Sequence, residues 1–192
     1  MGVGTDRALV GGMTGIHTIL VPIDFSDCTA GVVEQAAHLA AGLGAEVTLL
    51  HAAAVPPGTE DTQIIPAGSD QPVPMKQHLR RGAEERMVRY VELSRSRGAA
   101  TNSVFALGHP VESILSVEKE VGADLIVMGT HGRTGLRRLL LGSVAERVLR
   151  SADAPVMTVR SRWHDRCQAA SCAVCTSHRY PELDAARAEL DG

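Results

Sequence analysis

Short apolar runs alternate with longer segments of helical periodicity along most of the chain. The runs are rich in Val, Leu and Ile, and they fall at residues 17–23, 46–52, 100–107, 124–128 and 155–160. Runs of this length and composition predict strands that are buried on both faces of a sheet. Apolar residues recur at helical spacing in the segments 32–43, 75–97, 111–121 and 142–151. The pattern therefore predicts five strands and four helices in alternation.

Strands that alternate with helices pair in parallel through right-handed crossovers. The expected fold is α/β, with an open doubly wound parallel sheet flanked by helices. Ligands of such sheets bind beyond the carboxyl ends of the strands, where the strand order reverses. Residues 53–74 interrupt the alternation with five prolines and many polar residues. This segment predicts a long loop of the kind that is often mobile or functional.

Polar residues follow the first apolar run. Ser26 or Asp27 is expected to cap the first helix, because a side-chain oxygen there can accept from free backbone N–H groups. Asp24 has two interpretations, a helix cap or a ligand of a bound molecule, and the two can coexist. His51, at the end of the second run, is expected to be packed or hydrogen bonded, and Cys28 to be an inert thiol.

Composition and charge narrow the class of protein. Hydrophobic residues make up 44% of the chain and aromatic residues 3%, so the core must be aliphatic. The formal net charge of -3 lacks the basic excess of a nucleic-acid-binding protein. No apolar run approaches the roughly 20 residues that span a bilayer. The glycine-rich residues 1–15 predict a flexible arm and no secretory signal. Four cysteines, three of them close together, favour a cytoplasmic protein over a disulfide-stabilised secreted one.

The segment from Gly129 to Ser143 carries the strongest chemical signal. Gly129 ends the fourth apolar run, Gly132 follows, and Gly142 with Ser143 opens a helix. Glycines let a backbone approach an anion closely, and a helix start presents free N–H groups and the positive end of its dipole. The segment therefore predicts a phosphate-binding loop. It matches neither the P-loop pattern nor the dinucleotide fingerprint that follows a first strand.

Charged residues within this loop leave two interpretations open. Three arginines supply local positive charge, namely Arg133, Arg137 and Arg138. Arg137 and Arg138 either contact phosphate directly or are solvated. His131 has no neighbouring nucleophile in the sequence to activate, so we expect a loop residue without a catalytic role.

The loop resembles the Gly-x2-Gly-x9-Gly-Ser/Thr signature of ATP-binding universal stress proteins. Four further stretches are similar to that family, namely residues 19–26, 49–52, 123–132 and 154–159. The resemblance covers residues 16–161. It implies a Rossmann-like sheet of order 3-2-1-4-5, similar to the adenine nucleotide alpha hydrolases, and an adenosine site between the first and fourth strands.

The resemblance also implies the roles of individual residues. Asp24 is expected to bond the ribose or adenine side, and Gly132, Gly142, Ser143 and the N–H of Val144 to hold the phosphates with Mg²⁺. The residues expected to border the base and nucleoside are Pro22, Ile23, Ala52, Met128 and Gly129. The family often has a larger aliphatic residue at the position of Ala52, so looser packing against the base is expected. A homodimer through Val156–Val159 of the last strand is also implied.

Residues 162–192 lie beyond the family resemblance and contain a compact group of sulfur and nitrogen ligands. These residues are His164, Cys167, Cys172, Cys175 and His178. Tetrahedral Zn²⁺ needs four such ligands, and a segment with little apolar surface can fold around a metal. The alternatives are a disordered tail with free or redox-active thiols and, with an incomplete ligand set, an iron–sulfur cluster.

These observations predict an arm (1–15), a universal stress protein domain (16–161) and a Cys/His-rich tail (162–192). The first hypothesis for function is an ATP-binding stress protein with a nucleotide-sensing or protective role, acting on an unknown protein partner and without nucleic acid or membrane. The second is a slow ATPase or nucleotidyl-transfer enzyme on the same fold. The third is a metal- or redox-responsive adaptor that acts through the tail.

Overall fold

The computed structural model describes residues 15–26, 28–56, 58–68, 70–130 and 142–159. Among these residues, five parallel strands form one sheet: β1 (Thr18–Pro22), β2 (Glu46–Ala53), β5 (Ala100–Leu107), β6 (Leu125–Gly129) and β7 (Val156–Val159). The helices between them are α1 (Thr29–Leu43), α2 (Met75–Ser96), α3 (Pro110–Val121) and α4 (Ser143–Ser151). The predicted alternation of strands and helices is confirmed.

The strand order in the sheet is β5-β2-β1-β6-β7, and every neighbouring pair is parallel. In chain order these are the third, second, first, fourth and fifth strands of the sheet, so the expected order 3-2-1-4-5 is confirmed. The order reverses between β1 and β6, which pair through Ile19 with Leu125 and Leu20 with Ile126. This reversal of strand order is the topological switch point of the sheet, the place where doubly wound sheets bind ligands.

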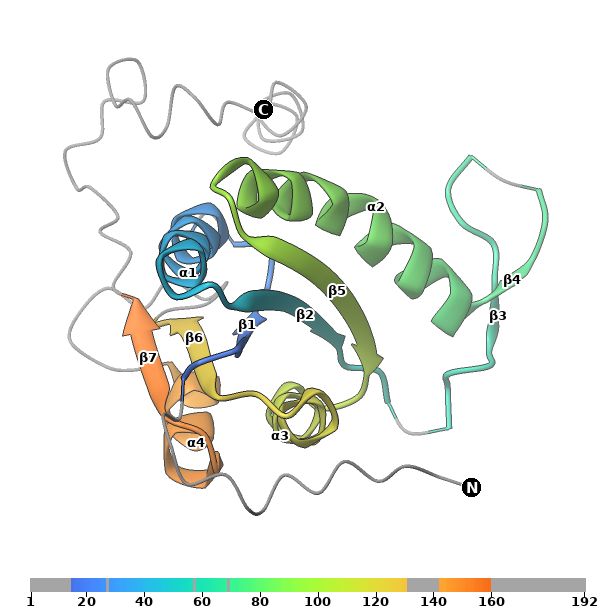
Figure 1. The fold of residues 1–192 in the computed structure, drawn as a ribbon. Coiled ribbons are helices and arrows are strands. Elements are labelled where there is room, and N and C mark those ends of the chain that lie inside the picture. Colours follow the sequence, from blue (N-terminus) through green and yellow to red (C-terminus); the bar gives the residue numbers. More distant parts are fainter. Residues whose placement is uncertain (1–14, 27, 57, 69, 131–141, 160–192) are drawn as a thin grey trace, which may run out of the picture. The chain divides into compact units, whose positions relative to one another are not determined.

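Two apolar layers cover the sheet (Figure 1). Helices α1 and α2 pack on one face, and α3 and α4 pack on the other. Strand β1 shows why both layers form: Ile19 and Val21 belong to the first core, Leu20 belongs to the second, and all three are fully buried. Burying one such side chain stabilises the fold by about 1.5–3 kcal/mol. The aliphatic strands therefore position the sheet edge where the site lies.

The start of α1 differs from the expected capped helix. The helix begins at Thr29, and Cys28 takes the cap position without a side-chain hydrogen bond to the helix. The expectation for Ser26 is therefore wrong, and Asp27 lies outside the described residues. The backbone N–H of Thr29 donates instead to the carbonyl oxygen of Ser26 at 2.9 Å. The Asp24 carboxylate lies within the same turn, where it accepts hydrogen bonds from the backbone N–H of Ser26 and the hydroxyl of Thr29 and caps no helical N–H group.

The proline-rich segment after β2 holds a small antiparallel pair that its sequence did not predict. Strands β3 (Gln63–Ile64) and β4 (Val73–Pro74) pair through Gln63 with Pro74 and Ile64 with Val73. Two-residue strands are too short to show a periodic pattern. The pair leads directly into α2, whose first residue, Met75, donates its N–H to the carbonyl of Thr62 at 2.9 Å.

None of the described helices is both long and apolar enough to cross a bilayer.

Candidate functional site

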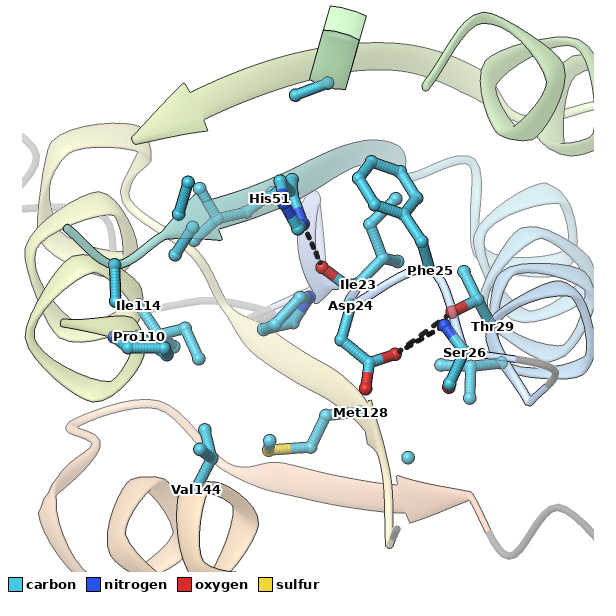
Figure 2. A pocket seen from close by; sticks show the side chains of 18 of the residues that line it. Ile23, Asp24, Phe25, Ser26, Thr29, His51, Pro110, Ile114, Met128 and Val144 are labelled. Carbon is cyan, nitrogen blue, oxygen red and sulfur yellow. Dashed lines mark hydrogen bonds between the residues drawn. The ribbon is translucent and has the colours of Figure 1, made fainter. Parts of the chain in front are cut away.

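A cleft of about 690 Å³ opens at the carboxyl ends of β1, β2 and β6 (Figure 2). Helix α2 contributes one wall, and the first turns of α3 and α4 contribute another. Nine of the ten residues expected to touch a nucleotide line this cleft. They are Pro22, Ile23, Asp24, Ala52, Met128, Gly129, Gly142, Ser143 and Val144. The tenth, Gly132, lies outside the described residues, so the sheet gathers into one place the nine that can be located.

The Asp24 carboxylate is oriented by its own turn. Its Oδ1 atom accepts from the backbone N–H of Ser26 at 3.0 Å and from the hydroxyl of Thr29 at 3.2 Å. Both of these bonds end on Oδ1, and Figure 2 shows the carboxylate directed toward the side of the cleft where Met128 lies. The second oxygen, Oδ2, has no hydrogen bond to another described side chain. Asp24 can therefore accept hydrogen bonds from a bound molecule while its turn holds it in place.

His51 contacts the residues on both sides of Asp24, and the amino-acid sequence did not predict these contacts. The Nδ1 atom of His51 lies 2.9 Å from the carbonyl oxygen of Ile23. The Phe25 ring packs against the His51 ring with 4.1 Å between ring centroids (Figure 2). Phe25 has φ = 60°, a left-handed conformation that is uncommon for a bulky residue. The flanking residues thus hold the turn that presents Asp24.

The same ring connects the turn to α2. The Arg86 guanidinium carbon lies 4.1 Å from the centroid of the Phe25 ring, and the Tyr90 ring lies 6.0 Å from it. A guanidinium over an aromatic face is a favourable cation–π arrangement. Phe25 is therefore held from the β2 side by His51 and from the α2 side by Arg86.

The start of α4 supplies the other end of the cleft. Gly142 donates its N–H to the carbonyl of Thr130 at 2.8 Å, and Glu146 makes the first helical bond to Gly142 at 2.9 Å. The N–H groups of Ser143, Val144 and Ala145 precede that bond and have no acceptor within their helix. Together with the helix dipole, these donors make a favourable environment for an anion.

Apolar side chains separate the carboxylate from the helix start. Met128 and Ile114 are buried and line the cleft, and Val144 and Pro110 lie beside them (Figure 2). The cleft therefore combines an anion-binding end, a carboxylate that can accept from hydroxyl groups, and apolar surface for a ring.

Several lining residues were not expected from the sequence. Pro110 and Ile114 open the helix after β5, so the Gly108–Pro110 turn at a strand end was the signal that could have found them. Phe25 and Thr130 directly follow the expected residues Asp24 and Gly129, so their place in the sequence was the available signal. Arg86 carried no such signal, because it lies in the middle of a polar helix.

Several residues that the sequence analysis singled out lie in parts of the chain that the structure does not describe. The loop residues Arg133, Arg137, Arg138 and His131, and the tail ligands His164, Cys167, Cys172, Cys175 and His178, lie outside the described residues. In the part of the chain that the structure describes, no group of three or more His, Cys, Asp or Glu side chains is arranged to hold a metal ion. A zinc site in the tail therefore stays a prediction.

Comparison with known sequences gives a consistent family. The sequence model of the Universal stress protein family matches residues 15–160. The universal stress protein MJ0531 of Methanocaldococcus jannaschii is 32% identical over 142 residues, covering 74% of this chain and 81% of that protein. Universal stress protein YxiE of Bacillus subtilis is 31% identical over 146 residues, covering 75% of this chain and 99% of that protein.

Solved structures share the fold. The structure of MJ0577 from Methanocaldococcus jannaschii matches with a TM-score of 0.63 and 26% identity, over 77% of this chain and 98% of that chain. A universal stress protein in complex with cAMP matches with a TM-score of 0.56 and 23% identity, over 77% of this chain and 98% of that chain. The universal stress protein from Archaeoglobus fulgidus in complex with dAMP matches with a TM-score of 0.54 and 24% identity, over 75% of this chain and 98% of that chain.

Proposed function

Because this chain belongs to the universal stress protein family, we propose that it binds ATP together with Mg²⁺ in the cleft at the ends of β1, β2 and β6. The observation that carries the proposal is the position of Asp24 and the first turn of α4 around one cavity. A carboxylate suits the hydroxyl groups of a ribose, and a helix start suits phosphate. In two solved proteins of this fold the ligands are also adenine nucleotides, cAMP and dAMP.

In the proposed complex the phosphates accept hydrogen bonds from the backbone N–H groups of Ser143 and Val144 and from the Ser143 hydroxyl. The ribose hydroxyls donate to Oδ2 of Asp24, and the adenine ring packs against Met128 and the end of β2 near Ala52. Apolar side chains around the ring reduce its contact with water and so favour binding.

Mg²⁺ fits this set of donors as a phosphate-bound ion. Magnesium usually keeps several waters and takes one or two protein oxygens in addition to substrate phosphates. The Ser143 hydroxyl at the start of α4 is the side-chain oxygen that would meet this requirement, because Asp24 is assigned to the ribose. The ion would neutralise phosphate charge next to the start of α4.

The proposed role is nucleotide sensing or protection in the stress response, in the cytoplasm. The alternative is a slow ATPase or nucleotidyl-transfer enzyme, which sustained release of ADP or AMP from Mg·ATP would favour. Turnover must then exceed that of a Gly142→Val variant, because a contaminating ATPase is insensitive to that substitution.

We also propose a homodimer through β7. This strand is at one end of the sheet, and Met157 on it is 41% exposed. An unpaired strand edge tends to pair with another chain, so a second copy is a suitable cover for it.

Calorimetric titration with Mg·ATP tests the site. Asp24→Ala and Gly142→Val are each expected to weaken binding at least tenfold, because they remove the ribose acceptor and crowd the phosphate end. Asp70→Ala and Gly42→Val make the same changes at exposed positions and should leave the affinity unchanged. The site assignment is wrong if both site variants bind ATP as the unmodified protein does.

A further inference from the structure

The cleft continues past the part assigned to the nucleotide, toward α2. Ala53 and Ala54 bound this extension at the end of β2, and Leu79, Gly82 and Ala83 bound it on α2. We call the space between these five residues the α2 lobe. The α2 residues are spaced three and four positions apart, so they share one face of the helix. The lobe therefore has a wall on each side and belongs to the same cavity as Asp24.

Gly82 keeps the lobe open. A Cβ atom built at Gly82 would meet no atom within 4 Å. Gly82 lies inside α2 and is not among the glycines with positive φ, so the backbone does not require glycine there. Glycine is an unfavourable residue in a helix interior. Its effect at this position is to leave bare backbone and free space in the middle of the α2 wall.

The walls of the lobe are apolar. Leu79 is half-buried, and it belongs to neither of the two core clusters of the described residues. Ala83 is buried, Ala53 is half-buried and Ala54 is exposed, so the lobe is open at the end of β2. An apolar group that enters the lobe would cover the Leu79 side chain and remove its apolar surface from water.

The lobe favours a neutral ligand group over a charged one. Arg86 follows Gly82 by one helical turn and stacks over the Phe25 ring at 4.1 Å. None of the five lobe residues carries a charge, so a charged ligand group would lose its hydration there without gaining a partner. A flat neutral ring can lie between the alanines of β2 and the bare backbone at Gly82.

From this cavity we infer that the site takes adenine nucleotides that carry an aromatic substituent on the outer edge of the purine. The inference rests on the proposed function. With the phosphates at α4 and the ribose at Asp24, the base lies at the end of β2, and the lobe continues from there. The substituent would occupy the lobe while the nucleotide keeps its contacts with Asp24 and Ser143.

Titrations with N6-benzyl-ATP and with ATP, each with Mg²⁺, test this inference. The unmodified protein is expected to bind N6-benzyl-ATP at least as tightly as ATP. Gly82→Leu fills the lobe and should weaken N6-benzyl-ATP binding at least tenfold while changing ATP affinity less than threefold. Gly42→Leu is the matched control, because Gly42 is an exposed glycine inside α1 with equally open space at its Cβ. It should change neither affinity.

The possible failures are distinguishable. If ATP binds and the unmodified protein rejects N6-benzyl-ATP by tenfold or more, the lobe does not receive the purine substituent and the proposed function survives. If Gly82→Leu weakens both ligands equally, the lobe is not a separate subsite and the inference is wrong. If neither nucleotide binds, the proposed function itself fails and the inference fails with it.

Discussion

The Nδ1 atom of His51 lies 2.9 Å from the carbonyl oxygen of Ile23, the residue directly before Asp24. A carbonyl oxygen only accepts, so Nδ1 carries the proton in this bond. The bond connects the ends of β1 and β2 at the cleft. It fixes the backbone that leads into the Asp24 turn, which makes His51 a positioning residue for the proposed nucleotide site.

Replacing His51 with phenylalanine keeps a ring next to Phe25 and removes the hydrogen bond. We expect His51→Phe to lower the free energy of unfolding by about 1 kcal/mol, because the half-buried carbonyl of Ile23 loses its partner. ATP affinity should fall as well, by less than about tenfold, which corresponds to 1.4 kcal/mol. Urea unfolding and calorimetric titration measure the two effects. His38→Phe, on the exposed face of α1, is the control. An unchanged ATP affinity in His51→Phe would show that the bond does not position Asp24.

The left-handed backbone at Phe25 predicts that glycine at this position gives a more stable protein than alanine. Phe25→Ala and Phe25→Gly both remove the ring contacts with His51 and Arg86. At φ = 60° a Cβ costs about 1–2 kcal/mol, and glycine avoids this cost. We therefore expect Phe25→Gly to be more stable than Phe25→Ala by about 1 kcal/mol, after allowance for the greater freedom of unfolded glycine.

Chemical denaturation of the two variants measures this difference. The control is Ala41→Gly at an exposed position of α1, where glycine should instead be the less stable residue by about 1 kcal/mol. If Phe25→Ala equals or exceeds Phe25→Gly in stability, the turn does not hold a strained backbone in solution.

The sequence was sufficient to predict the sheet and much of the cleft. Apolar runs that end in polar or glycine residues mark the carboxyl ends of strands, and Asp24, Met128 and Gly129 lie at such ends. Parallel strands then bring those ends together, since α/β connections have one hand. Parallel pairing therefore explains why residues more than a hundred positions apart line one cleft, whereas their assignment to a nucleotide was implied by the family resemblance.

Other features of the cleft depend on tertiary packing. Which face of α2 meets the cleft follows from how the helix crosses the sheet. The sequence therefore placed Leu79 only on the apolar face of its helix, and it gave no signal for Arg86. The left-handed φ at Phe25 contradicts local preference, which favours Gly or Asn, and is maintained by the contacts with His51 and Arg86. The β3–β4 pair is too short for periodicity to reveal.

The proposed dimer predicts a change of mass for one substitution on β7. Met157→Lys places a positive charge on the exposed strand, and two copies would face each other across a two-fold axis. We expect the unmodified protein to have the mass of two chains in light scattering and Met157→Lys the mass of one. Val88→Lys makes a similar change on α2, where Val88 is 54% exposed, and should not affect the mass. A monomeric unmodified protein would contradict the proposed interface.

The Cys/His-rich tail predicts a bound metal ion that is independent of the nucleotide. Protein purified without added metal is expected to contain about one equivalent of zinc, because three thiolates and one imidazole complete a tetrahedral site. Cys175→Ser removes a ligand and should lower the zinc content to less than half, whereas Cys28→Ser alters the thiol at the start of α1 and should leave it unchanged. Cys175→Ser should bind Mg·ATP normally. Less than about a tenth of an equivalent of any transition metal, in protein with reduced thiols, would instead favour free or redox-active cysteines.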